Sequence, residues 1–116
     1  MNNQTQTKKT WCSIDLSAIS HNYRQIKQKT NARIISIVKA GAYGHGAVPV
    51  AKALAKEGCD FFAVSSIEEA LELRHGGIDS SILILGYILP GRIKDAIEND
   101  ISFACASYDF AKLLSV

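Results

Sequence analysis

Short apolar segments alternate with amphipathic segments along this chain, and this alternation restricts its possible folds more than any other feature. The apolar segments resemble buried strands, and each is followed by residues spaced as one face of a helix. The pattern repeats every 20 to 27 residues or so, roughly the period of parallel βα units. The four expected strands are residues 33–38, 61–64, 81–85 and 101–105, and the expected helices are 47–57, 67–75, a segment around 93–97 and one from 107 onward.

The amino-terminal part predicts two further elements. Residues 10–16 are expected to form a short entry strand, with Trp11 among its apolar positions. A helix is expected to follow as far as about Lys29, capped by a side-chain oxygen of Asp15 or Ser17. Residues 1–10 are polar and basic and are interpreted as a tail, which leaves residues 11–116 as one domain.

The number of βα units decides between the two common parallel architectures. Right-handed crossovers in sequential order place all helices on one side of the sheet, whereas a doubly wound sheet needs helices on both faces. A closed (βα)8 barrel needs eight units and about 250 residues. This chain has 116 residues, and its last expected helix ends on apolar residues without a capping residue. The predicted fold is therefore α/β, the N-terminal half of a (βα)8 TIM-type barrel, in a truncated chain.

Composition excludes several classes of protein. With 47% hydrophobic and 21% charged residues, the chain is globular rather than disordered. Its net charge of +2 is too small to favour nucleic acid or a membrane surface as a partner. No apolar run approaches the length of about 18 residues that a membrane span needs. The three cysteines form no CxxC pair, which indicates reduced thiols and a cytoplasmic location, and no residue cluster has metal-ligand spacing.

The most informative motif is the segment 38–46, Val-Lys-Ala-Gly-Ala-Tyr-Gly-His-Gly. Lys39 directly follows an apolar strand, so it lies at the carboxyl end of the sheet, where active sites of βα proteins collect. An amine there can condense with an aldehyde, although a strand-end lysine is more often a solvated charge. Tyr43 offers a hydroxyl suited to a phosphate oxygen. The glycine spacing matches neither the dinucleotide-binding motif nor the P-loop.

This segment resembles the cofactor-lysine signature of alanine racemases, Val-Lys-Ala-Asn/Asp-Ala-Tyr-Gly-His-Gly, with one departure at Gly41. The resemblance continues from Trp11 to the end of the chain, through the segments 19–23, 62–65, 68–74 and 82–86. It implies an N-terminal (βα)8 barrel followed by a mostly β domain. It also implies pyridoxal 5'-phosphate as the cofactor and interconversion of L- and D-alanine, which supplies D-alanine for peptidoglycan.

The resemblance also implies a role for three residues of this chain. Lys39 would form the Schiff base with the cofactor and act as one of two catalytic bases. Tyr43 would hydrogen-bond the phosphate, and Leu85 would line the pocket against the pyridine ring. The other base of the family is a tyrosine from the second subunit of a homodimer, and it has no counterpart in these 116 residues.

Two alternatives to alanine racemisation remain open from the sequence. Serine/alanine racemases of the vancomycin-resistance type are similar in this region, and a non-catalytic fragment would bind the cofactor weakly or not at all. Gly41 replaces an amide or carboxylate that the family usually carries, which affects how the loop after Lys39 is held. Glu68 and Glu69 are interpreted as an acidic first helical turn with a capping box from Ser66, rather than as an acid/base pair.

Overall fold

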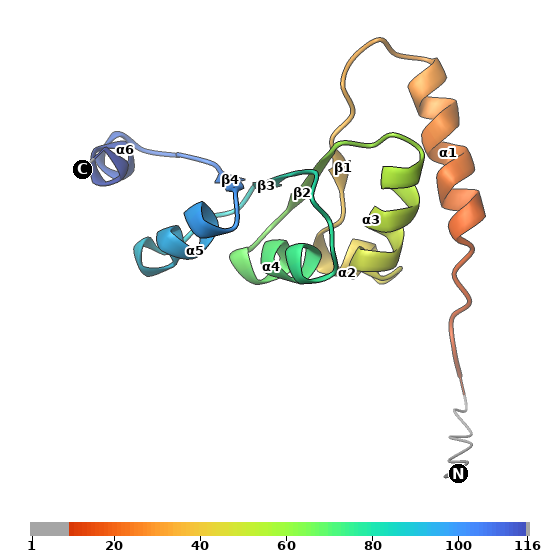
Figure 1. Cartoon of the computed structure of the whole chain (residues 1–116), viewed down its shortest axis with the longest axis horizontal. Helices are drawn as coiled ribbons and strands as arrows, with labels where there is room; N and C mark the ends of the chain where they lie inside the picture. Colours follow the sequence, from red (N-terminus) through yellow and green to blue (C-terminus); the bar gives the residue numbers. More distant parts are fainter. Residues whose placement is uncertain (1–9, 116) are drawn as a thin grey trace.

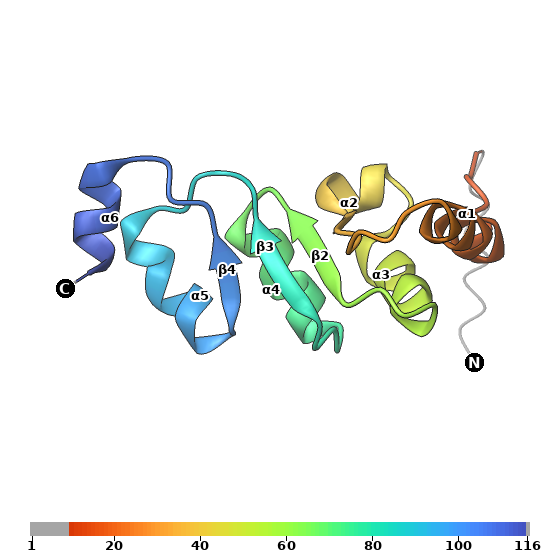
Figure 2. The same cartoon turned by 90° about the horizontal axis from the view of Figure 1, so that it is seen from above.

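The computed structural model describes residues 10–115. Four strands form an open parallel sheet in the order β1-β2-β3-β4, and helices connect them. The elements in chain order are α1 (Leu16–Gln28), β1 (Ser36–Ile37), α2 (Lys39–Tyr43), α3 (Ala47–Lys56), β2 (Phe61–Val64), α4 (Ile67–His75), β3 (Ser81–Ile84), η1 (Pro90–Arg92), α5 (Ile93–Glu98), β4 (Ile101–Phe103) and α6 (Tyr108–Leu114). Figure 1 shows α3, α4 and α5 on the same side of the strands. Figure 2 shows β2, β3 and β4 side by side, with α1 and α6 at opposite ends of the molecule. This is the arrangement predicted for sequential right-handed βα units.

The core lies between the sheet and the helices that cover it. Phe62 is in register with Ile82, and Val64 is in register with Ile84. All four side chains are buried, because alternate residues of a strand point to the same face and this face meets the helices. Leu73 of α4 is fully buried in the same cluster. Apolar burial of this kind is the main force that holds the βα units together.

Side-chain caps begin three of the helices, α1, α4 and α6, where the sequence predicts them. Asp15 accepts hydrogen bonds from two backbone N–H groups in the first turn of α1, at 2.9 and 3.2 Å. The Ser66 hydroxyl accepts from the Glu69 N–H at 3.3 Å and begins α4, and Ser107 caps α6 in the same way. Among residues 10–115, no helix combines the length and apolar character needed to cross a membrane.

Two expectations about the strands are wrong. The predicted entry strand at 10–16 does not form: residues 10–15 have no strand partner, Trp11 is 78% exposed, and Leu16 already belongs to α1. A strand needs a neighbour for its backbone hydrogen bonds, and here the sheet ends at β1. The strand at 33–38 is also not covered on both faces, since Ile35 and Ile37 are 40% and 38% exposed. Most of the predicted tail, residues 1–9, lies outside the described residues.

Candidate active site

The segment that follows β1, labelled α2, folds into a left-handed turn rather than a regular α-helix. Ala40, Gly41, Ala42 and Tyr43 have φ angles of 51°, 62°, 53° and 56°. Backbone N–H groups further along the chain donate to the carbonyls of Ala40 and Gly41 and close the turn. A residue with a Cβ pays about 1–2 kcal/mol to adopt this conformation. Three such residues within four positions mean that the surrounding structure must hold the turn in place, as is common at functional sites.

This turn places Lys39 and Tyr43 together at the carboxyl end of the sheet. The Val38 N–H donates to the Ala63 carbonyl at 2.9 Å, which continues the β1–β2 pairing up to the residue before Lys39. The Lys39 side chain is exposed, and its Nζ lies 6.0 Å from the centroid of the Tyr43 ring. Tyr43 itself is 62% exposed. The amine and the phenol are therefore both available to a ligand at this edge.

Leu85 lies at the same edge but two strands away. It follows β3, and its N–H donates to the Val64 carbonyl at 2.9 Å. Its side chain is 51% exposed. With neighbouring strands about 4.8 Å apart, the ends of β1 and β3 are separated by about 10 Å, so the space above β2 separates Leu85 from Lys39. A ligand of several ångströms could contact both.

Glu69, in the first turn of α4, joins two of these strand ends through its carboxylate. Its Oε1 accepts the Ala40 N–H at 2.9 Å, and its Oε2 accepts the N–H and the hydroxyl of Ser65 at 2.8 and 2.9 Å. Burial raises the pKa of this carboxyl, but the hydrogen bonds from Ser65 and Ala40 outweigh it, so the pKa lies below its ordinary value. The group is an ionised hydrogen-bond acceptor at neutral pH.

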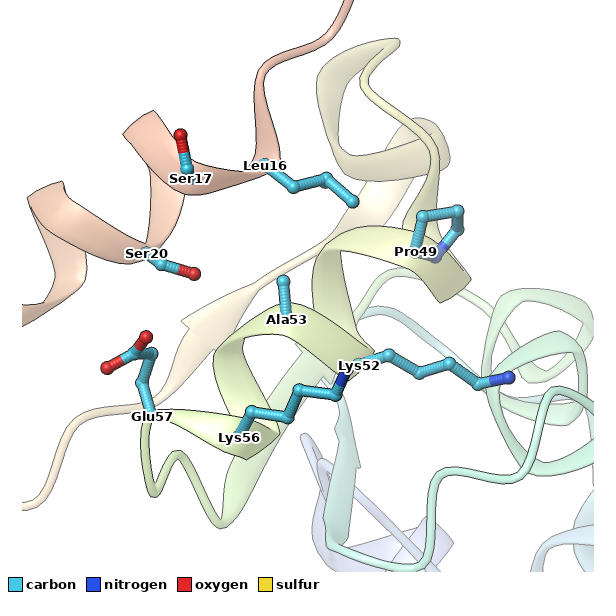
Figure 3. Close-up of a pocket in the computed structure, with 8 residues that line it drawn as sticks. All are labelled: Leu16, Ser17, Ser20, Pro49, Lys52, Ala53, Lys56 and Glu57. Carbon is cyan, nitrogen blue, oxygen red and sulfur yellow. The ribbon is translucent and has the colours of Figure 1, made fainter.

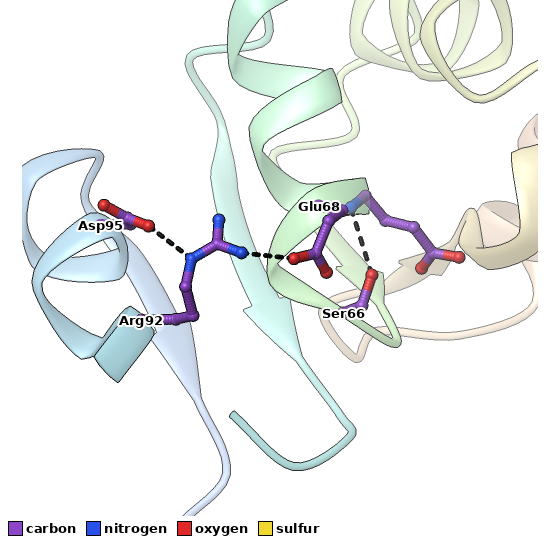
Figure 4. A network of polar contacts seen from close by, with 5 residues as sticks. Ser66, Glu68, Arg92 and Asp95 are labelled. Carbon is purple, nitrogen blue, oxygen red and sulfur yellow. Dashed lines mark hydrogen bonds and ion pairs between the residues drawn. The ribbon is translucent and has the colours of Figure 1, made fainter. Parts of the chain in front are cut away.

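The neighbouring carboxylate, Glu68, has a different partner. Figure 4 shows Arg92 between Glu68 and Asp95, with ion-pair distances of 2.5 Å to Glu68 and 2.6 Å to Asp95. This network joins the first turn of α4 to α5 on the outside of the molecule. The carboxylates of Glu68 and Glu69 thus have separate partners, and the cap of α4 by Ser66 agrees with the interpretation from sequence.

A surface groove runs between α1 and α3. Its volume is about 360 Å³, and Figure 3 shows Leu16 and Ser20 of α1 facing Pro49 and Ala53 of α3 across it. None of the residues predicted for the site lines this groove. It is the space left between two packed helices.

Sequence reasoning identified the position of the lysine and missed the contact that holds its turn. Lys39 and Tyr43 are brought together as expected, whereas Glu69 was assigned only a capping role. Ser66 does cap α4, but the Glu69 carboxylate turns to Ser65 and Ala40. Its contact with Ala40 spans 29 residues. The available signal was topological: a helix that starts at the end of β2 begins beside the end of β1.

Sequence comparison identifies relatives over nearly the whole chain. The family model for the alanine racemase N-terminal domain matches residues 14–116. Alanine racemase 2 of Caldanaerobacter subterraneus subsp. tengcongensis is 42% identical over 111 residues, which are 94% of this chain and 29% of that protein. The alanine racemase of Methanococcus maripaludis is 44% identical over 103 residues, 87% of this chain and 28% of that protein. The chain thus spans less than a third of the length of these relatives.

Solved structures share the fold as well. The alanine racemase of Clostridium difficile 630 matches with a TM-score of 0.87 at 40% identity, over 93% of this chain and 30% of that one. The alanine racemase of Bacillus anthracis with bound L-Ala-P matches with a TM-score of 0.80 at 38% identity, over 85% of this chain and 26% of that one. These matches agree with the predicted N-terminal half of a (βα)8 barrel. By sequence and by fold, the chain belongs to the alanine racemase family.

Proposed function

We propose that this chain contributes the cofactor-binding lysine to a pyridoxal-phosphate-dependent alanine racemase that interconverts L- and D-alanine for peptidoglycan synthesis. The observation that carries this proposal is the Lys39 amine at the carboxyl end of a parallel sheet, beside the exposed ring of Tyr43, in a chain of the alanine racemase family. The chain covers 29% of its relative from Caldanaerobacter, so we propose, in addition, that the complete reaction takes place in a longer protein of which this chain is a part.

The residues at this edge fit pyridoxal phosphate. Within residues 10–115, no carboxylate forms an ion pair with Lys39, so its amine is free to react. A Cβ built on Gly41 or Gly44 would have no atom within 4 Å, which leaves the backbone of the turn open to a bulky ligand. Lys39 would hold the cofactor covalently, the Tyr43 hydroxyl would bind the phosphate, and Leu85 would contact the ring.

When bound, pyridoxal phosphate supplies the electron sink that acidifies the α-proton of an amino acid. The chain's own residues then hold and move the proton. Once the substrate amine has displaced it from the cofactor, the Lys39 amine would remove the α-proton of one enantiomer, or deliver a proton to form that enantiomer, on one face of the substrate. The second base of the family would act on the opposite face, and the turn would fix the direction from which Lys39 approaches. Tyr43 restrains the phosphate end, so that binding energy far from the reacting carbon orients that carbon.

Residues 11–116 form part of the barrel domain, which is supported by the single hydrophobic cluster that includes side chains from α1 to α6. The complete enzyme works as a homodimer on alanine, which rests on the family resemblance alone. The protein is cytoplasmic, and the support for this is its cysteine content without CxxC pairs.

Cofactor trapping tests the central residue. The chain is mixed with pyridoxal phosphate, reduced with borohydride and mapped by mass spectrometry. Label is expected on Lys39 in preference to other exposed lysines. Lys39→Ala should lose the visible imine band, and Lys52→Ala, a matched change of an exposed lysine on α3, should retain it. A band that survives in Lys39→Ala at full strength would refute the role of Lys39.

A coupled assay tests whether racemisation needs residues outside this chain. Alanine racemisation, followed with D-amino-acid oxidase, is expected to be absent or very weak for these 116 residues, because the second base is expected from another part of the homodimer. Robust turnover by this chain would contradict that account. The same assay with serine in place of alanine tests the serine-racemase alternative in the complete enzyme.

A further inference from the structure

The turn that carries Lys39 donates a hydrogen bond to an acidic side chain of another element, Glu69 of α4. Within residues 10–115, the Glu69 carboxylate is the only side chain from outside residues 39–46 that hydrogen-bonds their backbone. It accepts the N–H of Ala40, the residue directly after Lys39, at 2.9 Å. The bond therefore acts on the peptide unit that links Lys39 to the left-handed residues.

The other oxygen of this carboxylate is anchored firmly. Oε2 accepts both the N–H and the hydroxyl of Ser65, at 2.8 and 2.9 Å, and Ser65 directly follows β2. Glu69 thus ties the end of β1 to the end of β2 with three charge-assisted hydrogen bonds, which are stronger than neutral ones. A carboxylate whose two oxygens accept three donors at once is oriented in a fixed direction.

The turn needs such support because its backbone is not in a preferred conformation. Ala40, Ala42 and Tyr43 have positive φ angles although each carries a Cβ. Residues in this region persist only where neighbouring groups determine their conformation. The Ala40 N–H is at the first of these residues, so a bond to it fixes the point where the chain changes from extended to left-handed.

We propose that Glu69 is a positioning residue: by holding the Ala40 N–H it fixes the left-handed turn and thereby aims the Lys39 amine over the carboxyl end of the sheet. This inference rests on the proposed function of Lys39 and adds a residue outside the 38–46 motif to the site. Glu69 does not exchange a proton with the substrate in this role. It acts only through the backbone on either side of Ala40.

Variants of Glu69 and its neighbours separate positioning from charge and from helix capping. Glu69→Gln keeps the size but offers one acceptor oxygen where three donors converge. Glu68→Gln removes the same charge one residue earlier and leaves the turn untouched, since Glu68 pairs with Arg92. Ser66→Ala removes the cap of α4 but not the carboxylate. Ser65→Ala, a milder variant, removes one of the three donors.

The first measurement needs no cofactor. Hydrogen exchange of the Ala40 amide, read by nuclear magnetic resonance, is expected to be about tenfold faster in Glu69→Gln than in the unsubstituted chain, because a donor released from its acceptor exchanges on local opening. Glu68→Gln and Ser66→Ala should leave this amide unchanged. Equal protection of Ala40 with and without the Glu69 carboxylate would overturn the inference.

The second measurement reports on the direction of the amine. Borohydride trapping of pyridoxal phosphate is scored as label on Lys39 relative to Lys94, an exposed lysine on α5. This ratio should fall about tenfold in Glu69→Gln, as expected when a reacting group loses its alignment. Acetylation of Lys39 by a small anhydride, which needs only an accessible amine, should change less than about twofold. A defect that merely exposed or buried Lys39 would change the trapping ratio and the acetylation of Lys39 together.

The outcomes distinguish this inference from the proposed function. Selective trapping on Lys39 that is lost in Glu69→Gln and kept in Glu68→Gln supports both. Selective trapping that persists unchanged in Glu69→Gln overturns the positioning role and leaves the function of Lys39 intact. Trapping that never favours Lys39, even in the unsubstituted chain, overturns the proposed function and the positioning role with it.

Discussion

Both ends of helix α4 hydrogen-bond the backbone around the strands. A carboxylate accepts at its first turn, and a guanidinium donates at its last turn. At its first turn, the Glu69 carboxylate accepts backbone N–H groups from the carboxyl ends of β1 and β2. At its last turn, the Arg74 guanidinium donates to four backbone carbonyls, those of Ile78, Ser80, Asn99 and Asp100, at 2.6 to 2.8 Å. These carbonyls lie in the loops that lead into β3 and β4.

The difference between the two ends indicates what each is for. Arg74 satisfies the carbonyls of ordinary connections, in which Asp100 is the only left-handed residue with a Cβ. Glu69 instead holds a turn in which three of four consecutive residues are left-handed residues with a Cβ. In βα barrels the amino-terminal face contributes stability and the carboxyl-terminal face contributes function. Removal of Arg74 should therefore cost stability, whereas removal of Glu69 should chiefly disturb Lys39.

The largest expected effect is on stability at the amino-terminal face. Arg74→Met keeps the aliphatic stem but leaves four carbonyls without their charged donor, and the loss of such bonds is expected to lower the free energy of unfolding by about 3 kcal/mol. Urea denaturation should show a lower midpoint with an unchanged slope. Trapping of pyridoxal phosphate on Lys39 under native conditions should be unaffected.

Arg33 provides the control for this change. Its guanidinium pairs with Asp60 at 3.1 Å, and both side chains are more than half exposed. Arg33→Met should shift the urea midpoint far less than Arg74→Met, because exposed ion pairs contribute little. Equal shifts for the two variants would mean that the carbonyl contacts of Arg74 add nothing beyond a surface charge.

The next effect should involve both stability and the site. A Cβ on Gly86 would collide with the backbone carbonyl of Ser65, the residue that anchors Glu69. Gly86→Ala is expected to lower the free energy of unfolding by about 2 kcal/mol and to reduce trapping on Lys39, because backbone must move to accept the methyl group. Gly91→Ala is the matched control, since a Cβ there meets nothing within 4 Å. If Gly86→Ala traps pyridoxal phosphate on Lys39 as well as the unsubstituted chain does, a shift of the backbone at the end of β2 does not affect the Lys39 turn.

A smaller effect follows the protonation of Glu69. Its pKa is lowered in the folded chain from an ordinary value of 4.5, so its contribution to stability is complete above 4.5 and is lost as the pH falls through the folded pKa. The difference in unfolding free energy between the unsubstituted chain and Glu69→Gln should therefore be greatest near neutral pH and shrink below 4.5. Asp15, Asp60 and Glu68 also have lowered pKa values, but both proteins retain them and their effects cancel. A difference that is constant with pH would show that the carboxylate is not the group responsible.

The parts of the structure that local sequence determines were predicted well. The four strands of the sheet, the cap at Ser66 and the strand-end position of Lys39 depend on apolar spacing and capping residues within short segments. For the segment after Lys39 the sequence shows the spacing of the glycines but not the left-handed conformation, because neither alanine nor tyrosine favours positive φ. The Glu69–Ala40 contact depends on two strands being neighbours. The prediction of an entry strand at 10–16 was wrong, because an apolar pattern does not indicate whether a partner strand is present.

The smallest effect concerns Gly41, where this chain departs from the family signature. Its φ of 62° is one that glycine adopts freely, and asparagine and aspartate, the usual residues of the signature, tolerate it better than other residues do. Gly41→Ala should therefore lower the free energy of unfolding by about 1 kcal/mol, and Gly41→Asn should lower it less, although the asparagine side chain is larger. No atom lies within 4 Å of a Cβ at this position, so a β-carbon meets no steric obstacle there. Urea denaturation of the two variants measures which of them loses more free energy of unfolding. A greater loss of this free energy in Gly41→Asn than in Gly41→Ala would show that space, rather than backbone conformation, selects the residue after Ala40.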